Sequence, residues 1–443
     1  MSHYKPYPSY KDSGVERIGE VPEHWDIRSV KHLYDARLGK MVQPQPKSDE
    51  DVLVPYHRAQ TVQWESIRYD QVESMWANPA EIEAYSLNEG DLLICEGGDV
   101  CRSSIFNRNE HETVIFQNSV HRVRPLNGNH SEWLLRLMQI VRSTGWIDVL
   151  CNKNTIVHFT SDKLASLECP HPPQDEQAQI LTALRKETAR IDALIAKKTR
   201  FIELLKEKRS ALITHAVTKG LDPNVEMKDS GVEWLGEVPA HWEITKLKRG
   251  YTIKLGKMLQ PSPKFEDDLL LPYMRASNIQ PTGIEVTDIN EMWFSQNEIK
   301  DLRLMSGDLL VSEGGDVGRC AIWTNELPEI YFQNSINRIR SCEQNSNFYL
   351  GYLLQSIKQS GAIDVICNKL SIAHLTAEKL NEIEILFPVP EEQSAIATFL
   401  DRETGRIDAL VEKTRKSIDL LKERRSALIS AAVTGKIDVR DAL

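Results

Sequence analysis

The chain contains 443 residues, of which 41% are hydrophobic, and its formal net charge at pH 7 is −10. This apolar fraction is enough to form buried cores, which excludes a disordered chain, and the length fits about three domains, or two domains and a helical element. The acidic net charge, taken alone, argues against a nucleic-acid-binding protein.

The sequence gives no sign of a membrane span or of a disulfide framework. It has no run of about 18 apolar residues, and its first residues, MSHYKPYPSY, are polar and interrupted by proline, so we expect a soluble, cytoplasmic protein. The seven cysteines are an odd number and form no CxxC pair, so neither disulfides nor a zinc site is indicated. Cys151 and Cys367 are interpreted as buried thiols.

The first predicted element is an N-terminal segment that occurs twice in the chain. Residues 12–27 (DSGVERIGEVPEHWDI) match residues 229–244 (DSGVEWLGEVPAHWEI) at twelve of sixteen positions. Each copy contains, two residues before its end, a His-Trp pair that follows Val-Pro and one further residue. We predict that Trp25 and Trp242 pack into a core where each of two globular domains begins.

The repeat continues through five short motifs that both copies share. They are LGKM at 38–41 and 255–258, PYxRA at 55–59 and 272–276, EGGDV at 96–100 and 313–317, FQNS at 116–119 and 332–335, and CNK at 151–153 and 367–369. The offset between the copies is 217 residues early and 216 residues late, so one residue is gained or lost between the third and fourth motifs. An internal repeat of this length indicates a duplicated domain.

Each globular part is predicted to be an α/β domain built from short strands and short helices. Strands are expected at 92–94, 119–124, 309–311 and 335–340, because a Gly-Asp turn or an apolar–polar alternation marks each of them. Helices are expected at 131–143 and 347–359. Prolines 170, 172 and 173, like prolines 388 and 390, end the globular parts, and residues 219–228 form a polar linker.

A long helix is predicted after each globular part, at residues 174–218 and 391–434. Proline and acidic residues suit its first turn, and at 1.5 Å per residue the first copy would be about 60 Å long. Apolar residues repeat at heptad spacing and require a partner. The predicted seam comprises Leu184, Ile191, Leu194, Leu205 and Leu212 in the first helix and Leu400, Ile407, Leu410, Leu421 and Leu428 in the second.

Two arrangements of these helices are open: a coiled coil between two chains, or an antiparallel pair within one chain. Two matching helices in one chain favour the second arrangement. We therefore predict an α/β protein with two tandem globular domains separated by two long antiparallel coiled-coil helices, related by a pseudo-twofold axis. Its segments are a first domain at 1–173, a first helix at 174–218, a second domain at 219–390 and a second helix at 391–435.

A two-fold protein of this kind could present two similar surfaces to duplex DNA. Residues 185–209 hold nine Lys or Arg against four Asp or Glu, so the acidic total does not exclude local basic surface. EGGDV is either a tight turn that uses the conformational freedom of glycine or a loop that approaches a DNA phosphate, and both can hold. PYxRA is either a surface strand or a base-reading segment, since Arg suits guanine and Asn or Gln suits adenine.

The residues that could contact DNA share a polar side chain and a place in or beside a repeated motif, and each alone is a weak candidate. They are Lys40, Arg58, Gln60, Arg102, Asn118, Asn152, Lys153, Lys257, Arg275, Asn278, Arg319, Asn334, Asn368 and Lys369. His158 and His374 occupy matching positions, but no acidic or cysteine companion near them indicates a metal site. The chain has no Walker A, dinucleotide-binding, methyltransferase, zinc-protease or serine-hydrolase motif, which agrees with a binding role.

Taken together, the doubled GEVPxHW segment, the GDLL strand and the LLKE helix ending in SALI resemble the specificity subunit of type I restriction-modification enzymes. The resemblance covers nearly the whole chain. It implies two target-recognition domains that each read one half of a bipartite DNA site, and helices that act as a spacer. It also implies two docked adenine-N6 methyltransferase subunits and two ATP-driven restriction and translocase subunits, which would hold the S-adenosylmethionine, ATP and magnesium sites.

The two copies share more motifs than recognition domains of this family usually do, so we predict related half-sites around a non-specific spacer. Two other classes of protein are weighed against this one. A self-contained nuclease or methyltransferase would need a catalytic motif that the chain does not display, and would act alone. A coiled-coil scaffold would bind no DNA.

Overall fold

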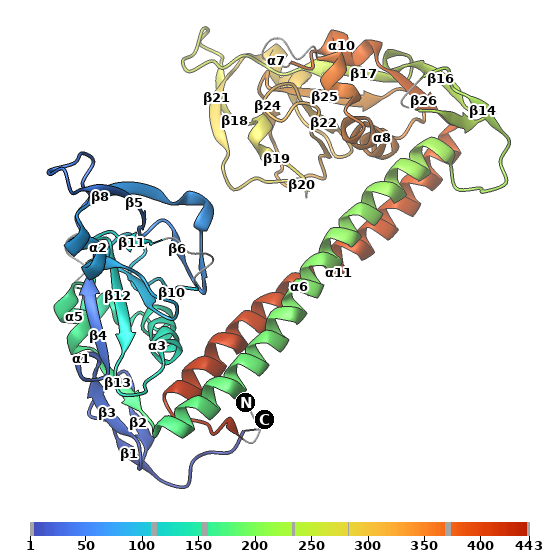
Figure 1. Ribbon diagram of the computed structural model, residues 1–443. Helices are drawn as coiled ribbons and strands as arrows, with labels where there is room; N and C mark the ends of the chain where they lie inside the picture. The colour runs from blue at the N-terminus through green and yellow to red at the C-terminus, as the bar shows by residue number, and fades with distance from the viewer. Residues whose placement is uncertain are drawn as a thin grey trace. The chain divides into compact units, whose positions relative to one another are not determined.

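The computed structural model describes residues 4–107, 113–151, 158–232, 235–281, 283–367 and 374–440. These residues form two compact units: unit 1 contains residues 1–199 and 415–443, and unit 2 contains residues 200–414 (Figure 1). The two long helices, α6 (Gln174–Lys219) and α11 (Pro390–Val433), each contribute to both units. Each unit is therefore a globular domain joined to one portion of each helix.

The globular domain of unit 1 is built on a four-stranded antiparallel sheet and a three-stranded mixed sheet. The four-stranded sheet has the order β10-β9-β12-β4, and the three-stranded sheet has the order β11-β5-β8 with β11 parallel to β5. The strands are β4 (Tyr34–Leu38), β5 (Val52–His57), β8 (Glu73–Ala77), β9 (Leu92–Cys95), β10 (Ser103–Ile105), β11 (Ile115–Phe116) and β12 (Val120–Pro125). All four residues of β9 are buried, as expected for a central strand after a Gly-Asp turn.

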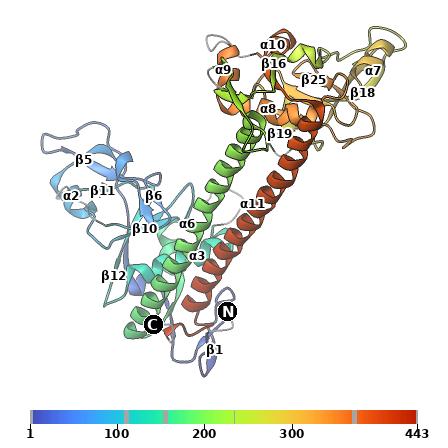
Figure 2. The same cartoon turned by 90° about the vertical axis from the view of Figure 1, so that its right-hand side faces the viewer.

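Helices and short hairpins complete unit 1. Helix α3 (Ser131–Ser143) packs on the four-stranded sheet and lies beside α6 (Figure 2). The other helices are α1 (Val30–Leu33), α2 (Pro79–Tyr85), α4 (Trp146–Leu150) and α5 (Ser161–Ser166). The remaining strands are β1 (Tyr10–Asp12), β2 (Glu20–Pro22), β3 (Asp26–Ser29), β6 (Val62–Gln63), β7 (Ser66–Ile67) and β13 (Glu168–His171).

Unit 2 repeats the same topology at the offset that the sequence shows. Its four-stranded sheet has the order β17-β25-β22-β23 and its three-stranded sheet has the order β21-β18-β24. The strands are β14 (Met227–Asp229), β15 (Glu237–Pro239), β16 (Glu243–Lys246), β17 (Tyr251–Leu255), β18 (Leu269–Met274), β19 (Ile279–Gln280), β20 (Gly283–Ile284), β21 (Asn290–Phe294), β22 (Leu309–Ser312), β23 (Cys320–Ile322), β24 (Tyr331–Phe332), β25 (Ile336–Ser341) and β26 (Glu384–Phe387). The helices are α7 (Gln296–Leu302), α8 (Asn347–Gln359), α9 (Ala362–Ile366) and α10 (Ala377–Glu382). The predicted fold class and the duplication are confirmed.

The repeated N-terminal segment fixes the beginning of each long helix. Trp25 and Trp242 are fully buried, as predicted. The indole Nε1 of Trp25 donates to Glu176 Oε1 at 3.2 Å, and that of Trp242 donates to Glu392 Oε2 at 2.9 Å. Both glutamates lie in the first turn of their helix, where a carboxylate is also favoured by the helix dipole. The buried tryptophan therefore anchors the helix to its domain.

The two helices run antiparallel within each unit. In unit 1 the start of α6, around Ile180 and Leu184, shares a core with the end of α11, around Leu428 and Val433. In unit 2 the end of α6 shares a core with the start of α11. Arg425 Nε and Asp192 Oδ1 form a 3.0 Å ion pair in unit 1, and the matching pair in unit 2 joins Arg209 Nε and Asp408 Oδ1 at 3.1 Å.

The predicted seam is correct for the residues that are spaced by multiples of seven along each helix and wrong for two others. Leu184, Ile191, Leu205, Leu400, Ile407 and Leu428 are buried, and Leu212 and Leu421 are partly buried. Leu194 and Leu410 are 42% and 40% exposed, because the second position of each heptad follows the first by four residues rather than three. The seam residues at these places are Ile195, which is partly buried, and Val411, which is buried.

Two further expectations concern cysteines and membranes. Cys151 and Cys367 are buried and unpaired, as interpreted from the sequence. Within the described parts of the chain, none of the helices combines the length and the apolar character needed to span a bilayer.

Candidate nucleic-acid interface

Four of the five shared motifs come together at one place in each globular domain. In unit 1 the backbone N–H of Gln117, in FQNS, donates to the carbonyl of His57 at 2.9 Å, and that of Ala59, in PYxRA, donates to Ser119 Oγ at 3.0 Å. In unit 2 the N–H of Gln333 donates to the carbonyl of Met274 at 2.9 Å, and that of Ala276 donates to Ser335 Oγ. The motifs therefore recur because they are parts of one structure.

The glycine of LGKM is required by the close approach of FQNS. A Cβ atom on Gly39 would lie 2.3 Å from the carbonyl oxygen of Gln117, and one on Gly256 would lie 2.3 Å from that of Gln333. Both contacts are with backbone atoms, which cannot move aside as a flexible side chain can. The next residue bridges to the same strand, since Lys40 N donates to Phe116 O at 2.9 Å. Any other residue at these positions would separate LGKM from FQNS.

The EGGDV segment is a tight turn that is joined to PYxRA by an arginine. Gly98 and Gly315 both have φ of +73°, a left-handed conformation that glycine adopts without strain. Arg102 Nη2 donates to the carbonyl of Ala59 at 2.7 Å, and Arg319 Nη2 donates to that of Ala276 at 3.0 Å. Both arginines thus hold the two motifs together, and their side chains are about four-fifths buried, with 18% and 20% exposed.

The arginines of PYxRA form ion pairs with carboxylates at the surface. Arg58 Nη2 is 2.7 Å from Glu73 Oε1, and Arg275 Nη2 is 2.6 Å from Asp288 Oδ2. Each arginine side chain is 29% exposed. Such exposed ion pairs contribute little stability and can exchange their carboxylate for another anion. Arg58 and Arg275 therefore stay candidates for contact with DNA, together with Gln60, which is exposed.

Asn278 is corrected by the structure, which gives it a local structural role. It is 3% exposed; its Oδ1 accepts from Arg275 N at 2.8 Å, and its Nδ2 donates to the carbonyls of Glu285 and Asp288. Its counterpart in unit 1 is Thr61, not Gln60, since Thr61 Oγ1 accepts from Arg58 N at 3.1 Å. Both side chains fix the turn that carries the arginine.

Lys40 and Lys257 are also corrected, because their ammonium groups are buried in ion pairs. Lys40 is 6% exposed, and its Nζ lies 2.6 Å from Glu81 Oε1 and 3.1 Å from Gln43 Oε1. The Lys257 side chain is 8% exposed and is paired with Glu298. In both cases burial lowers access to a phosphate. The lysines instead tie LGKM to the helix that follows β8 or β21.

The remaining candidates divide into two groups. Asn118 and Asn334 are half-buried, and their backbone N–H groups donate to Lys40 O and Lys257 O at 2.9 Å, which brings them into the motif cluster. Asn152, Lys153, Asn368 and Lys369 lie outside the described residues. Of each CNK motif only the cysteine, Cys151 or Cys367, belongs to the described residues.

Two histidine–glutamate pairs lie beside the cluster, and the sequence did not indicate them. His158 Nδ1 is 3.1 Å from Glu96 in EGGDV, and His374 Nδ1 is 3.0 Å from Glu313. The partners are about 60 residues apart in the chain, so no local spacing signals them. Among the described residues no group of three or more His, Cys, Asp or Glu side chains is placed to hold a metal ion.

The buried histidine of PYxRA in unit 1 has no histidine counterpart in unit 2. His57, at the end of β5, is fully buried, and its Nδ1 lies 3.0 Å from Thr61 Oγ1. Burial lowers its pKa to about 4, so the ring is neutral at pH 7. Unit 2 has Met274 at the matching position.

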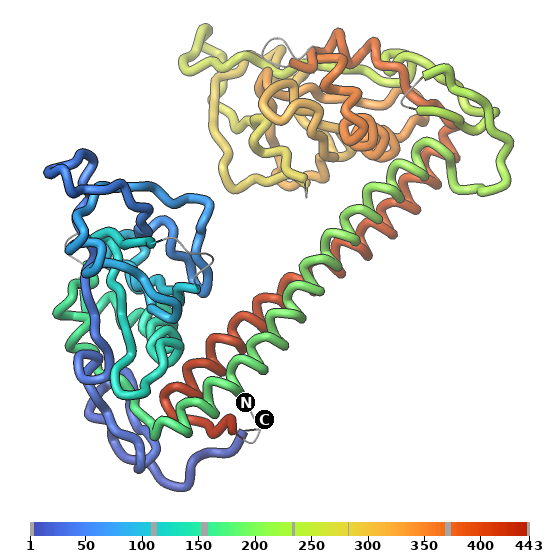
Figure 3. The backbone as a smooth tube through the Cα atoms, viewed as in Figure 1, coloured from blue at the N-terminus to red at the C-terminus, as the bar shows by residue number. Residues whose placement is uncertain are grey.

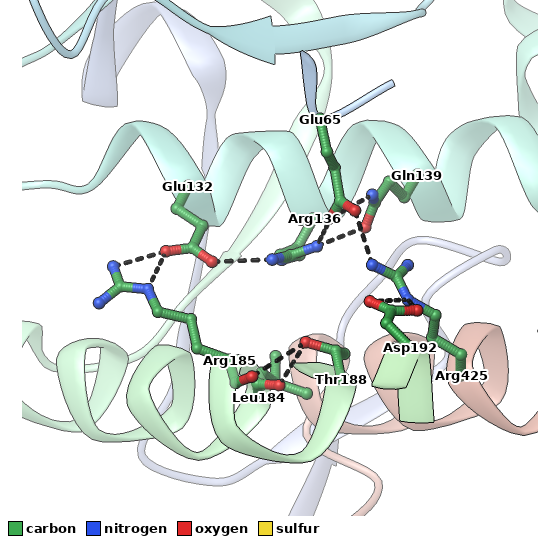
Figure 4. A network of polar contacts seen from close by, with 9 residues as sticks. All are labelled: Glu65, Glu132, Arg136, Gln139, Leu184, Arg185, Thr188, Asp192 and Arg425. Carbon is green, nitrogen blue, oxygen red and sulfur yellow. Dashed lines mark hydrogen bonds and ion pairs between the residues drawn. The ribbon is translucent and has the colours of Figure 1, made fainter. Parts of the chain in front are cut away.

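A network of charged side chains joins the globular domain of unit 1 to the helices (Figure 4). Glu65, at the tip of the β6–β7 hairpin, forms ion pairs with Arg136 of α3 and, at 2.6 Å, with Arg425 of α11. Arg425 Nε also lies 3.0 Å from Asp192 of α6. Figure 4 shows the Glu65 carboxylate pointing between the two guanidinium groups. The hairpin follows PYxRA directly, so this network holds the candidate DNA-contacting segment to the helix pair.

The network continues along α3, and unit 2 replaces the two α3 residues, Glu132 and Arg136, with the neutral residues Phe348 and Tyr352. Glu132 accepts from Arg136 Nη2 at 2.9 Å and is paired with Arg185 of α6. In unit 2 the matching residues include Tyr352, whose hydroxyl donates to Asp401 Oδ1 at 2.7 Å. The sequence offered no signal for Glu65, because its partners lie 71 and 360 residues away.

Comparison with known proteins places these features in one family. The profile of the type I restriction modification DNA specificity domain matches the chain twice, at residues 22–204 and 239–420. The chain is 25% identical to the MjaX type I restriction enzyme specificity subunit of Methanocaldococcus jannaschii, over 97% of this chain and 98% of the relative. It is also 25% identical to the MjaVIII type I restriction enzyme specificity subunit of the same organism, over 65% of this chain and 66% of the relative.

Solved structures show the same fold. A chain from a study of the assembly and conformational transition of the type I R-M system superposes with a TM-score of 0.70, at 14% identity, over 93% of this chain and 98% of that one. The HsdS subunit of Thermoanaerobacter tengcongensis superposes with a TM-score of 0.55, at 14% identity, over 94% of this chain and 98% of that one.

Proposed function

We propose, from the premise that the chain belongs to the type I restriction-modification DNA specificity family, that it directs a restriction-modification complex to a bipartite DNA sequence. A specificity subunit is a DNA-recognition subunit and has no catalytic role of its own. Each of the two tandem target-recognition domains would read one half of the target.

The observation that carries the proposal is the repeated motif cluster. Both domains bring LGKM, PYxRA, EGGDV and FQNS together with the same backbone hydrogen bonds, and both present one arginine beside an exposed carboxylate. A guanidinium in this position can exchange its carboxylate for a guanine edge or a phosphate. Arg58 and Arg275 are the residues we assign first to DNA contact.

The similarity of the two clusters bears on the target sequence. Because the turn that carries each arginine is held by the same contacts, we propose that the two half-sites are related and form a near-palindromic target around a non-specific spacer. The two units also differ, since Gln60 in unit 1 is replaced by Ser277 in unit 2. The half-sites are therefore expected to be similar but not identical.

The partners and cofactors follow from the same assignment. We propose that two copies of an adenine-N6 methyltransferase subunit and two restriction and translocase subunits assemble with this chain on duplex DNA in the cytoplasm. The S-adenosylmethionine, ATP and magnesium sites would belong to those partners. The chain itself would need no cofactor to bind DNA, and its acidic net charge predicts weak DNA binding without the partners.

The experiment that tests the proposal is adenine methylation by the complex. The chain is co-expressed with the methyltransferase subunit of the same system, and methylated adenines are mapped on host DNA by single-molecule sequencing. We expect one bipartite motif with related halves. Methylation without a sequence preference would reject the role in recognition, and two unrelated half-sites would reject the proposed relation between them.

The spacing between half-sites can be tested separately. We propose that the paired helices set this spacing, because their seam fixes how residues of α6 and α11 are matched. Insertion of about four residues, one helical turn, after Ala196 should lengthen the spacer and leave the half-sites unchanged. Altered half-sites in that variant would contradict a spacing role for the helices.

A further inference from the structure

Each globular domain carries a short apolar tip where its LGKM motif ends. Met41 and Val42 form the tip of unit 1, and Met258 and Leu259 form the tip of unit 2. Met41 is 74% exposed and Met258 is 73% exposed, and the residues that follow them are 42% and 51% exposed. Single exposed apolar residues are common on protein surfaces. A tip that recurs at the matching position of a duplicated domain, with the same exposure, indicates a contact that both domains make.

The tip is fixed at both ends by hydrogen bonds. In unit 1, Lys40 N donates to Phe116 O at 2.9 Å before the tip, and Trp76 N donates to Gln43 O at 2.9 Å after it. The buried Lys40 Nζ also donates to Gln43 Oε1 at 3.1 Å, which ties the two ends together. Unit 2 repeats the backbone bonds, at 3.1 Å each, from Lys257 N to Phe332 O and from Trp293 N to Gln260 O. A tip fixed in this way loses little conformational entropy when it meets a partner.

The tip of unit 1 lies at the same edge of its domain as the arginine of PYxRA. LGKM, FQNS and PYxRA run side by side in parallel, since Lys40 pairs with Gln117 and Phe116 pairs with His57. The backbone N–H of Gln117 continues this ladder to the carbonyl of His57, the residue before Arg58. Neighbouring strands are about 4.8 Å apart, so the backbones of Lys40 and Arg58, two spacings from each other, are separated by about 10 Å.

Unit 2 has the same arrangement. Lys257 pairs with Gln333 and Phe332 pairs with Met274, both in parallel. The tip of unit 2 and Arg275 therefore also share one edge. Figure 3 traces the loop that follows each tip, which leads into β5 or β18, as a protrusion from its unit.

The chemistry of the base pairs determines what such a tip can read. In the major groove a guanine presents O6 and N7, which an arginine recognises, and the apolar group that a base pair presents there is the C5 methyl of thymine. Neither tip contains a charged residue, so its contact is with a base and not with a phosphate. Successive base pairs are about 3.4 Å apart, so an offset of about 10 Å spans about three of them.

We propose that Met41 and Met258 each contact the methyl group of a thymine in the half-site that their own domain reads. The inference rests on the proposed function, in which Arg58 and Arg275 contact DNA. It adds an apolar base contact to each domain, within about three base pairs of the base that the arginine contacts.

The test uses the full chain in complex with the methyltransferase subunit of the same system, on duplexes that carry the target found by methylation mapping. Each thymine of a half-site is replaced in turn by deoxyuridine, which removes the methyl group and keeps every hydrogen-bonding group. Fluorescence anisotropy of labelled duplexes measures the dissociation constants. The wild-type complex should lose affinity about fourfold at one thymine of each half-site, because burial of one methyl-sized group corresponds to about that factor.

Variants of the two methionines assign each thymine to its domain. Met41→Ser should abolish the effect of uracil in one half-site and Met258→Ser in the other, so the second half-site is a control within the same complex. Met41→Leu keeps an apolar side chain and should keep the effect. Met305→Ser alters a methionine outside the tips that is 55% exposed, and it should change neither effect. Thermal unfolding of every form checks that the fold is retained.

Three results would overturn the inference and leave the proposed function intact. In the first, no thymine of the wild-type target is sensitive to loss of its methyl group. In the second, the effect of uracil persists in both serine variants. In the third, the serine variants weaken binding equally to thymine and uracil duplexes, as they would if the tips contacted a protein partner. A wild-type complex that binds all duplexes equally, the target included, would reject the proposed function itself.

Discussion

Replacing Glu65 with alanine would remove the carboxylate through which the β6–β7 hairpin reaches the helices of unit 1. That carboxylate is paired with Arg136, accepts from Gln139 Nε2 at 3.0 Å and lies 2.6 Å from Arg425 Nη2. The Glu65 side chain is 31% exposed, so its ion pairs lie between the surface and buried cases. After the substitution Arg136 keeps Glu132 and Arg425 keeps Asp192, so neither guanidinium is left without a carboxylate.

The expected cost follows from these contacts. Charge-assisted hydrogen bonds contribute about 1.5–3 kcal/mol when partly buried and less at the surface. The substitution should therefore lower the free energy that holds the hairpin closed by about 1–2.5 kcal/mol. It should appear as local opening of the hairpin and not as global unfolding. Hydrogen exchange of the backbone amides of residues 62–67 should then be about 5- to 70-fold faster, since 1.36 kcal/mol corresponds to tenfold.

Salt and pH provide two further readouts of the same contact. Partial burial raises the pKa of Glu65, but the guanidinium groups of Arg136 and Arg425 outweigh it and hold that pKa below its ordinary value. A lowered carboxyl pKa means that the stabilisation is complete above the unfolded value, about 4.3, and is lost as the pH falls through the folded value. High salt should also reduce the difference in hydrogen-exchange rate between wild type and variant, because it screens the ion pairs.

The hairpin of unit 2, formed by β19 and β20, is an internal control in the same molecule. Its exchange should not respond to the change at Glu65. Unchanged exchange of residues 62–67 in the Glu65→Ala variant, or an equal acceleration in both hairpins, would refute the reasoning. In the first case the network would carry no local stability, and in the second the effect would be global.

Three other perturbations give expected outcomes. Gly39→Ala should lower the free energy of unfolding, measured by thermal denaturation, by about 2–4 kcal/mol, because its Cβ would clash with backbone atoms. Gly405 lies in a helix with open space around it, so Gly405→Ala should raise the free energy of unfolding by about 0.5–1 kcal/mol. Ile202 follows the seam residue Ile195 by one heptad and is 6% exposed, whereas its neighbour Phe201 is 42% exposed. Ile202→Ala should therefore lower the free energy of unfolding in denaturant by about 2–4 kcal/mol and Phe201→Ala by under about 1, and equal losses would reject this position of the seam. His57→Met should reduce the loss of stability in acid. The lowered pKa of His57, about 4, makes its contribution to wild-type stability fall as the pH drops from about 6.5 towards 4, and titration of the unfolding midpoint of both forms measures the difference.

Sequence reasoning was most successful where the signal was local or repeated. The duplication, the buried Trp25 and Trp242 and the sevenfold positions of the seam could all be predicted, because each depends on residue type and spacing along one element. A repeat is also informative because a residue that the fold requires should occur at the matching position in both copies. Gly39 and Gly256 are an example, because the same close approach to the backbone of FQNS occurs in both units.

The polar candidates were harder to judge, because residue type does not reveal where a charge is neutralised. Lys40 was a candidate for phosphate contact until the structure placed Glu81 within 2.6 Å of its ammonium group. Asn278 was a candidate for base contact, but its amide groups are used by the backbone around it. The carboxylates and carbonyls that pair with such groups come from distant segments, so no pattern in the sequence signals them.

By itself the sequence determined that this protein is two copies of one α/β domain, each followed by a long amphipathic helix. Periodicity and repetition are properties of the amino-acid sequence and can be read from it directly. Only the tertiary structure decided which heptad position is buried, which arginines remain available at the surface and that Glu65 joins a recognition domain to α11. The physical reason is that burial and ion pairing depend on the distances between segments far apart in the chain.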